Sequence, residues 1–142
     1  MKQTIKSNST LRIIDANINR CREGLRVIED CLRYVLDDAA LYKKIRGIRH
    51  NTDKILRENY ALLIAKRDAV SDGGRKMPET SQKKLPEIII ANFKRAQESL
   101  RVLEEYSKTV FPDLSPLFKK QRYAAYNAEK NVCLKYKNLF NE

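Results

Sequence analysis

The chain has 142 residues, of which 42% are hydrophobic and 33% are charged, a composition typical of one soluble domain and not of a disordered chain. No apolar run approaches the roughly 20 residues that a membrane span needs, and the first residues contain no apolar signal core, so we expect a cytoplasmic protein. The net charge of +11 indicates an anionic partner, which phosphorylated metabolites, nucleotides and nucleic acid all satisfy.

Apolar residues recur at helical spacing along most of the chain and predict an all-α fold without a sheet. The four long helices that this pattern predicts lie near residues 10–36, 39–65, 86–109 and 115–139. Between the second and the third, residues 66–85 form a linker without helical periodicity. A connection of this length is uncommon in compact domains and is often functional.

Candidate capping residues support these boundaries. Ser9 or Thr10 is the expected N-cap of the first helix, and Asp38 is that of the second. Pro86 suits the first turn of the third helix, and Ser115 is the expected cap of the fourth.

One stretch of the first helix is repeated in the third. Residues 15–30 read DANINRCREGLRVIED and residues 90–105 read IANFKRAQESLRVLEE, so eight residues recur at a constant offset of 75 positions. The similarity continues in the following helices, where residues 41–46 match 117–122 and residues 51–54 match 127–130. An internal repeat of this size indicates a duplicated structural unit.

The expected architecture is therefore one domain, residues 1–142, built from two helical hairpins. The first repeat covers about residues 10–65 and the second about 86–139. Two such hairpins bury their apolar stripes against each other as a bundle with pseudo-twofold symmetry. We predict that residues 14–56 superpose on residues 89–132.

Both copies of the repeat place an asparagine and an arginine in the apolar arc of the helix. Burial of such groups is costly unless they have partners, so these residues predict a shared polar centre. The candidate residues for binding a phosphate or a flat heterocycle are Asn17, Arg20, Glu23, Asn92, Arg95 and Glu98. An equally good interpretation is a structural network in which each arginine forms an ion pair with a carboxylate of the other repeat.

Other polar residues of the motif have a simpler interpretation. The charged residues expected mostly on the solvent face are Arg26, Glu29, Asp30, Arg101, Glu104 and Glu105. Arg26 with Asp30 and Arg101 with Glu105 are the expected i,i+4 pairs. His50 lies opposite the apolar stripe of its helix and is expected to face solvent. The three cysteines show no ligand-like spacing and are expected to be reduced packing residues.

The linker contains two carboxylates four residues apart, Asp68 and Asp72. Such a pair could hold Mg²⁺, which is often bound by one or two carboxylates together with substrate phosphate. The glycines Gly73 and Gly74 could let backbone amides approach an anion, although the same residues are also ordinary turn formers. No Gly-x-x-x-x-Gly-Lys-Ser/Thr sequence is present, which excludes a P-loop.

The duplicated motif resembles a family of thiamine-biosynthesis domains that occur alone or fused before a thiamine-phosphate synthase barrel. The resemblance covers nearly the whole chain, including Arg49-His50, Arg67-Asp68 and Asp72-x-Gly74. The chain differs mildly from the family pattern, with Gly73 in place of valine and Ser99 in place of alanine. The chain is too short to add a barrel of about 200 residues, so we expect that domain to be absent.

The family is assigned as an alternative hydroxymethylpyrimidine phosphate kinase. The resemblance therefore implies a transferase that moves a phosphoryl group from ATP, with Mg²⁺, to hydroxymethylpyrimidine phosphate. A kinase needs metal, positive charge and an oriented nucleophile. Asp68 and Asp72 are the candidate catalytic and metal-binding residues, and Arg67 is a further candidate for phosphate binding.

Two other functions stay open. The first is a non-catalytic helical accessory or ligand-binding partner of thiamine-phosphate synthase. The second is a basic helical nucleic-acid binder, but lysine and arginine are spread over all predicted helices among acidic residues, and no known nucleic-acid-binding signature is present. The expected partners are thus a phosphorylated pyrimidine, a nucleotide and the synthase, with no membrane, and a homo-oligomer stays open.

Overall fold

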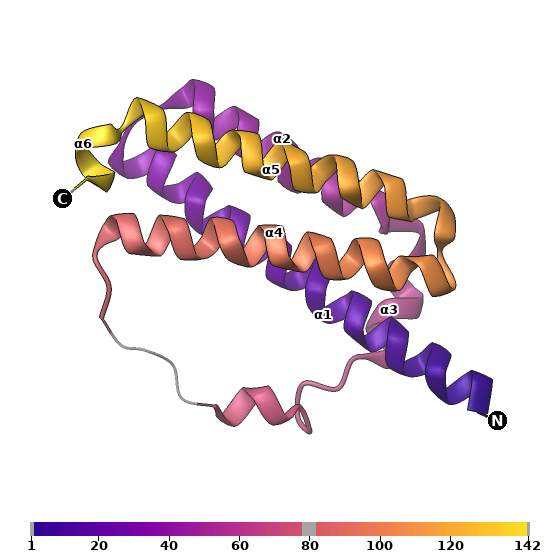
Figure 1. The fold of residues 1–142 in the computed structure, drawn as a ribbon. Coiled ribbons are helices and arrows are strands. Elements are labelled where there is room, and N and C mark those ends of the chain that lie inside the picture. Colours follow the sequence, from indigo (N-terminus) through magenta and orange to yellow (C-terminus); the bar gives the residue numbers. More distant parts are fainter. Residues whose placement is uncertain (1, 78–81, 142) are drawn as a thin grey trace.

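The structure, a computed structural model, describes residues 2–77 and 82–141, and the side chains of α1 from residue 8 onward. Within these residues it contains six α-helices and no strand (Figure 1). The helices are α1 (Lys2–Asp30), α2 (Ala39–Ile55), α3 (Tyr60–Lys66), α4 (Leu85–Val110), α5 (Ser115–Lys135) and α6 (Lys137–Phe140). The predicted all-α class is confirmed. The predicted number of helices is wrong, because the short helices α3 and α6 are separate elements.

Helix α1 is longer than the cap pattern predicts. It begins at Lys2, so Ser9 and Thr10 lie inside the helix and do not cap it. At its other end α1 passes into a π-helical turn, Cys31–Val35, and Asp37 then adopts a positive φ of 50° that ends the helical path. Asp38 caps α2 as expected, since its Oδ1 accepts a hydrogen bond from the Leu41 amide at 3.0 Å.

The second predicted helix is broken near its end. Leu56 leaves the helical conformation, with φ −108° and ψ 8°, and a 3₁₀ turn, Arg57–Asn59, leads into α3. This turn redirects the chain so that α3 packs against α1, with Leu56 and Leu63 both buried. No proline or glycine signals the break, which depends on the packing partner.

The helices of the second repeat differ from the prediction in part. The backbone of Tyr136, with φ −113° and ψ 43°, ends α5, and the short α6 follows. Pro86 lies in the first turn of α4, as predicted. Ser115 does not cap α5 with its side chain; its hydroxyl donates instead to the Glu104 carbonyl of α4 at 2.8 Å.

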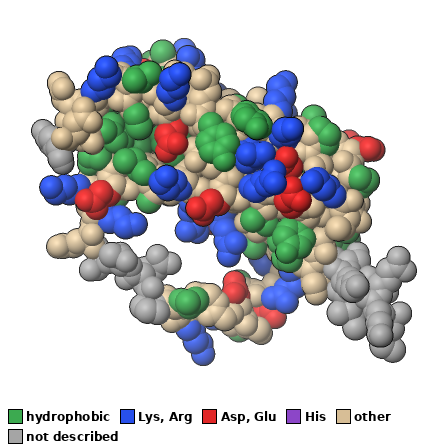
Figure 2. All heavy atoms as spheres, viewed as in Figure 1, with side chains coloured by type: hydrophobic (Ala, Val, Ile, Leu, Met, Phe, Trp, Pro, Cys, Tyr) green, Lys and Arg blue, Asp and Glu red, His purple; other side chains and the backbone are tan. Residues whose placement is uncertain are grey.

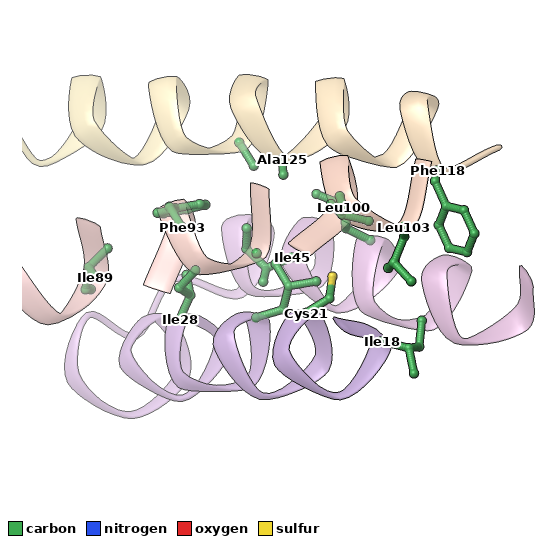
Figure 3. Close-up of a cluster of buried hydrophobic side chains, with 14 of the residues drawn as sticks. Ile18, Cys21, Ile28, Ile45, Ile89, Phe93, Leu100, Leu103, Phe118 and Ala125 are labelled. Atoms are coloured by element: carbon green, nitrogen blue, oxygen red, sulfur yellow. The ribbon is translucent and has the colours of Figure 1, made fainter. Parts of the chain in front are cut away.

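The four long helices enclose one core. Helix α1 packs on α2 and α4, and α5 packs on the same two helices, so α2 and α5 form a layer over α1 and α4 (Figure 1). Apolar side chains from all four helices point into the space between them (Figure 3); those labelled there are Ile18, Cys21, Ile28, Ile45, Ile89, Phe93, Leu100, Leu103, Phe118 and Ala125. Burial of this stripe is what stabilises the bundle.

Equivalent residues of the two repeats make equivalent backbone contacts. The Asn17 side-chain amide donates to the Ile13 carbonyl, and the Asn92 amide donates to the Ile88 carbonyl, both at 2.8 Å. The superposition of the two complete hairpins stays a prediction. In the part of the chain that the structure describes, no helix combines the length and the hydropathy that crossing a membrane requires.

Candidate functional site

An open cleft with a volume of about 810 Å³ lies between α1, the start of the linker and α4. Its walls come from α1 (Ser9, Arg12, Ile13, Asp15, Ala16, Asn17, Asn19, Arg20, Glu23), from the linker (Arg67, Asp68, Ala69, Asp72) and from α4 (Val102, Tyr106). In Figure 2 the linker crosses beneath the helical body, and an opening separates the two. The cleft thus brings together six of the nine predicted site residues, which are Asn17, Arg20, Glu23, Arg67, Asp68 and Asp72.

A bidentate ion pair fastens the linker to α1 beside this cleft. Arg67 Nε and Nη2 donate to Asp15 Oδ2 and Oδ1, both at 2.7 Å. Asp15 is buried, and its hydrogen bond raises the pKa of Arg67. The sequence analysis missed Asp15, although the sequence contains a signal for it. The equivalent residue of the second copy is Ile90, so only the first repeat, which precedes the linker, has a carboxylate at this position.

Asn17 is buried, as expected, whereas the predicted burial of Arg20 is wrong. The Asn17 side chain bonds in two directions, since Nδ2 donates to the helix backbone and Oδ1 accepts from Arg20 Nη1 at 3.4 Å. The long aliphatic stem of Arg20 carries its guanidinium out to solvent, a behaviour common for arginine at the edge of an apolar stripe. Within the described residues neither Arg20 nor Arg12 forms an ion pair with a carboxylate.

The predicted polar residues of the second copy, Asn92, Arg95 and Glu98, do not line the cleft, so the two copies do not form one polar centre. Helices α1 and α4 run antiparallel (Figure 1) and approach closely where Gly24 meets the Asn92 carbonyl. Arg95 is exposed and reaches only Glu23, with an N–O distance of 3.8 Å. Glu98 lines a separate shallow hollow beside Arg101. The antiparallel crossing places equivalent residues at opposite ends of the contact.

The two linker carboxylates cap local turns. Asp68 Oδ1 accepts from the Ser71 amide and Asp72 Oδ1 accepts from the Gly74 amide, both at 3.0 Å. The hydrogen bond from Ser71 lowers the pKa of Asp68. No group of three or more potential metal-ligating side chains occurs in the described ranges. The pair therefore fits a magnesium ion only where a bound ligand adds phosphate oxygens.

Two glutamates of the repeated motif are buried, which corrects their expected place on the solvent face. Glu29 is fully buried and accepts from Arg49 Nε and, at 3.0 Å, from Arg49 Nη2. Glu104 is also buried and accepts from Arg122 Nε at 2.9 Å. Both arginines come from the second helix of their own hairpin, so these ion pairs hold each hairpin together.

The other surface expectations hold. Arg26 pairs with Asp30 at 3.8 Å and Arg101 pairs with Glu105 at 3.3 Å, both near the solvent. His50 is exposed. The cysteines are free, and burial raises the pKa of the Cys21 thiol to about 12, so this thiol is not a nucleophile.

Comparison with known proteins identifies relatives. Residues 12–131 match the model of the ThiD2 family. The thiamine-phosphate synthase of Nostoc punctiforme is 37% identical over 124 residues, which cover 85% of this chain and 34% of the relative. That of Rhodopirellula baltica is 36% identical over 138 residues, 94% of this chain and 37% of the relative. That of Prochlorococcus marinus is 39% identical over 131 residues, which cover 90% of this chain and 37% of the relative.

These findings correct the predicted activity. The chain spans about a third of the length of these relatives, all of which are named for a synthase and not for a kinase. The expectation of an ATP-dependent hydroxymethylpyrimidine phosphate kinase is therefore wrong, and ATP, expected only as its phosphoryl donor, has no support. The alternative of a helical accessory or ligand-binding partner of thiamine-phosphate synthase fits better. No solved structure is significantly similar to this chain.

Proposed function

The chain belongs to the ThiD2 family of thiamine-biosynthesis domains, and we propose that it is a non-catalytic helical partner of thiamine-phosphate synthase that binds a phosphorylated pyrimidine. The proposed binding site is the cleft between α1, the linker and α4. Its volume is in the range of small-molecule sites, and it joins the first copy of the repeated motif to the start of the linker.

The observation that carries this proposal is the presence of two arginines on the cleft wall that form no ion pair with a described carboxylate. Arg12 acts on Asp68 only through a longer-range attraction, which contributes to the lowered pKa of that carboxylate. The other two arginines of α1 form ion pairs, Arg22 with Asp53 at 3.0 Å and Arg26 with Asp30 at 3.8 Å. Arg12 and Arg20 are thus the cations available to an incoming anion. A guanidinium binds a phosphate bidentately, and such charge-assisted hydrogen bonds are stronger than neutral ones.

The opposite wall suits a flat ring. Tyr106 of α4 lines the cleft and is 42% exposed, so part of its side chain is accessible to a ligand. Asn17 also lines the cleft, and a hydrogen bond to the backbone already orients its amide. We expect the pyrimidine to stack near Tyr106 while its phosphate contacts the arginines.

Mg²⁺ is part of the proposal as a bridging ion. Asp68 and Asp72 each use one carboxylate oxygen in a turn and lie on the linker wall of the cleft. Magnesium keeps several waters and is often held by one or two carboxylates with substrate phosphate. The ion would therefore join the ligand phosphate to the linker.

Calorimetric titration of hydroxymethylpyrimidine phosphate into the chain, with and without Mg²⁺, tests the site. Arg20→Ala should weaken binding by about tenfold or more, a loss typical of a charge-assisted contact. The matched control is Arg95→Ala, which removes the equivalent arginine outside the cleft. Both variants should keep their stability within about 0.5 kcal/mol, because both side chains are at the surface. Absence of binding, or an equal loss in both variants, would refute the proposed site.

The Mg²⁺ contribution has its own control. Asp72→Asn should reduce the enhancement of binding by Mg²⁺ and leave binding without the metal nearly unchanged, and Asp68→Asn should act in the same way.

The effect on the synthase is tested by adding the chain to a separate thiamine-phosphate synthase at low substrate concentration, where a partner that binds the substrate should raise turnover. Chemical conversion of the ligand by the chain alone would contradict a non-catalytic role.

A further inference from the structure

A further hollow lies in the other layer of the bundle, on the side away from the linker. It is a groove of about 330 Å³ between α2 and α5, which lie side by side in Figure 1. Ile48, Ala124 and Ala128 form its apolar part. Its polar residues are Lys43, Lys44, Asn51, Lys120, Gln121 and Asn127, together with a third asparagine. No aspartate or glutamate lines it.

The groove repeats the pseudo-symmetry of the chain. Lys44 corresponds to Lys120 and Asn51 corresponds to Asn127 in the alignment of the two hairpins. The two walls thus share one equivalent lysine and one equivalent asparagine, whereas Lys43 of α2 and Asn131 of α5 have no counterpart in the groove. A ligand with two anionic groups could meet one lysine from each hairpin.

The lysines of the groove have no acidic partners. Among the residues that the structure describes, none of these lysines takes part in an ion pair, and all are exposed. The nearest acidic residues of the two helices point elsewhere: Asp53 pairs with Arg22 of α1, and Glu129 accepts from Gln97 of α4. The positive charge along the groove is therefore uncompensated within the described chain.

Gln121 gives an independent indication of a ligand. Gln121 is 8% exposed, yet its side chain forms no hydrogen bond to another described residue. In the described residues, every fully enclosed side-chain nitrogen or oxygen atom has a hydrogen-bond partner. Since the amide of Gln121 has none, it must be in contact with solvent through the groove that Gln121 lines. The equivalent residue of the first hairpin is Ile45, a core residue. The second hairpin thus places an amide, with free hydrogen-bonding capacity that faces the groove, where the first hairpin has a core isoleucine.

We infer that this groove is a second anion-binding site, specific for a compact polyanion of the diphosphate class. Lysine ammonium groups supply the charge, and the amides of Gln121 and the two asparagines donate hydrogen bonds to the oxygens between them. The groove and the cleft lie on opposite layers, so the inference does not depend on the proposed function.

The test is a titration of the full chain with inorganic diphosphate at physiological ionic strength, followed by backbone amide shifts in NMR. We expect saturable binding, with the largest shifts near Asn51, Gln121 and Asn127. Methyl diphosphate should bind comparably if the ligand is a diphosphate ester, and inorganic phosphate should bind more weakly. The variant Lys44→Gln with Lys120→Gln should weaken diphosphate binding by about tenfold or more.

The chain provides a matched control in a second equivalent pair of lysines. Lys54 and Lys130 are exposed on the same two helices, outside the groove, and Lys54→Gln with Lys130→Gln removes the same net charge. This control should change the affinity by less than about twofold. An equal loss in both double variants would show a diffuse charge effect and overturn the site. Shifts confined to α1 and the linker would also overturn it, as would binding of a short RNA that diphosphate does not displace.

Discussion

Arg67 forms a bidentate ion pair with Asp15 that joins the start of the linker to α1, with both N–O distances at 2.7 Å. The pair stands between two hollows, since both residues line the large cleft and a smaller pocket of about 230 Å³ beside Tyr60 and Leu63. One wall of the cleft therefore depends on this contact. It also fixes the path of the chain just before Asp68.

Removing the arginine of this pair should loosen the linker. Arg67→Ala leaves the buried carboxylate of Asp15 without its partner and should lower the free energy of unfolding by about 1–3 kcal/mol. We also expect faster proteolysis within the linker and weaker ligand binding in the cleft. Limited trypsin digestion and urea denaturation measure these effects. Arg75→Ala, an exposed linker arginine, is the control, and an equal change in both variants would contradict the role of the pair.

The buried ion pairs inside the hairpins predict a larger effect on stability. Glu29→Gln leaves the Arg49 guanidinium, which is mostly buried, without a counter-charge, and Glu104→Gln does the same to Arg122. Each should cost about 3–5 kcal/mol in urea denaturation, as expected when one partner of a buried pair is removed. Glu105→Gln alters only partly exposed pairs, with Arg101 and Lys108, and should cost about 0.5 kcal/mol or less. Similar losses in all three variants would show that burial is not the cause.

Features set by local spacing could be predicted from the sequence. The stripe that includes Ile14, Leu25 and Ile28 is fully buried, because a helix brings residues three and four apart to one face. The cap at Asp38 and the start near Pro86 also depend only on neighbouring backbone groups. In both cases the local geometry of the helix determines the sequence pattern as well as the structure.

Features set by a distant partner could not be predicted in the same way. Glu29 has the spacing of a surface residue, and its burial depends on Arg49 of another helix. The break at Leu56 depends on packing against α1, and Arg20 reaches solvent only because its stem is long. The cleft itself lies between α1 and a linker more than 40 residues away in the sequence. The one sequence signal for this contact is Asp15, a carboxylate that only the first copy of the motif contains.

Asp38 should make stability depend on pH in the acidic range. Its carboxylate accepts from the Leu41 amide, forms an ion pair with Lys135 at 2.6 Å and accepts from the Tyr136 hydroxyl at 2.7 Å. These contacts lower its pKa from 3.8 to about 2. Because the folded-state pKa is the lower one, the contribution is present above pH 3.8 and is lost as the pH falls toward 2.

The variant Asp38→Asn isolates this contribution, because asparagine is also a good N-cap but cannot pair with Lys135. Near neutral pH it should be less stable than the natural chain, by on the order of 2 kcal/mol for a shift of this size. Near pH 2 the difference should disappear. Urea denaturation at both pH values measures it, with the exposed Asp113→Asn as a control. A difference that is independent of pH would assign the loss to the cap instead of the charge.

The two helical glycines predict opposite effects of the same substitution. A Cβ on Gly24 would lie 3.0 Å from the Asn92 carbonyl oxygen of α4, and that backbone is held within a helix. Gly24→Ala should therefore push α1 and α4 apart and cost about 1–3 kcal/mol, as overpacking of a tight contact does. A Cβ on Gly47 meets nothing within 4 Å. Gly47→Ala should stabilise the chain by about 0.5–1 kcal/mol, since alanine favours a helix interior over glycine. Thermal and urea denaturation of the two variants decide the matter: a neutral or stabilising Gly24→Ala would show that the helices do not depend on this close approach.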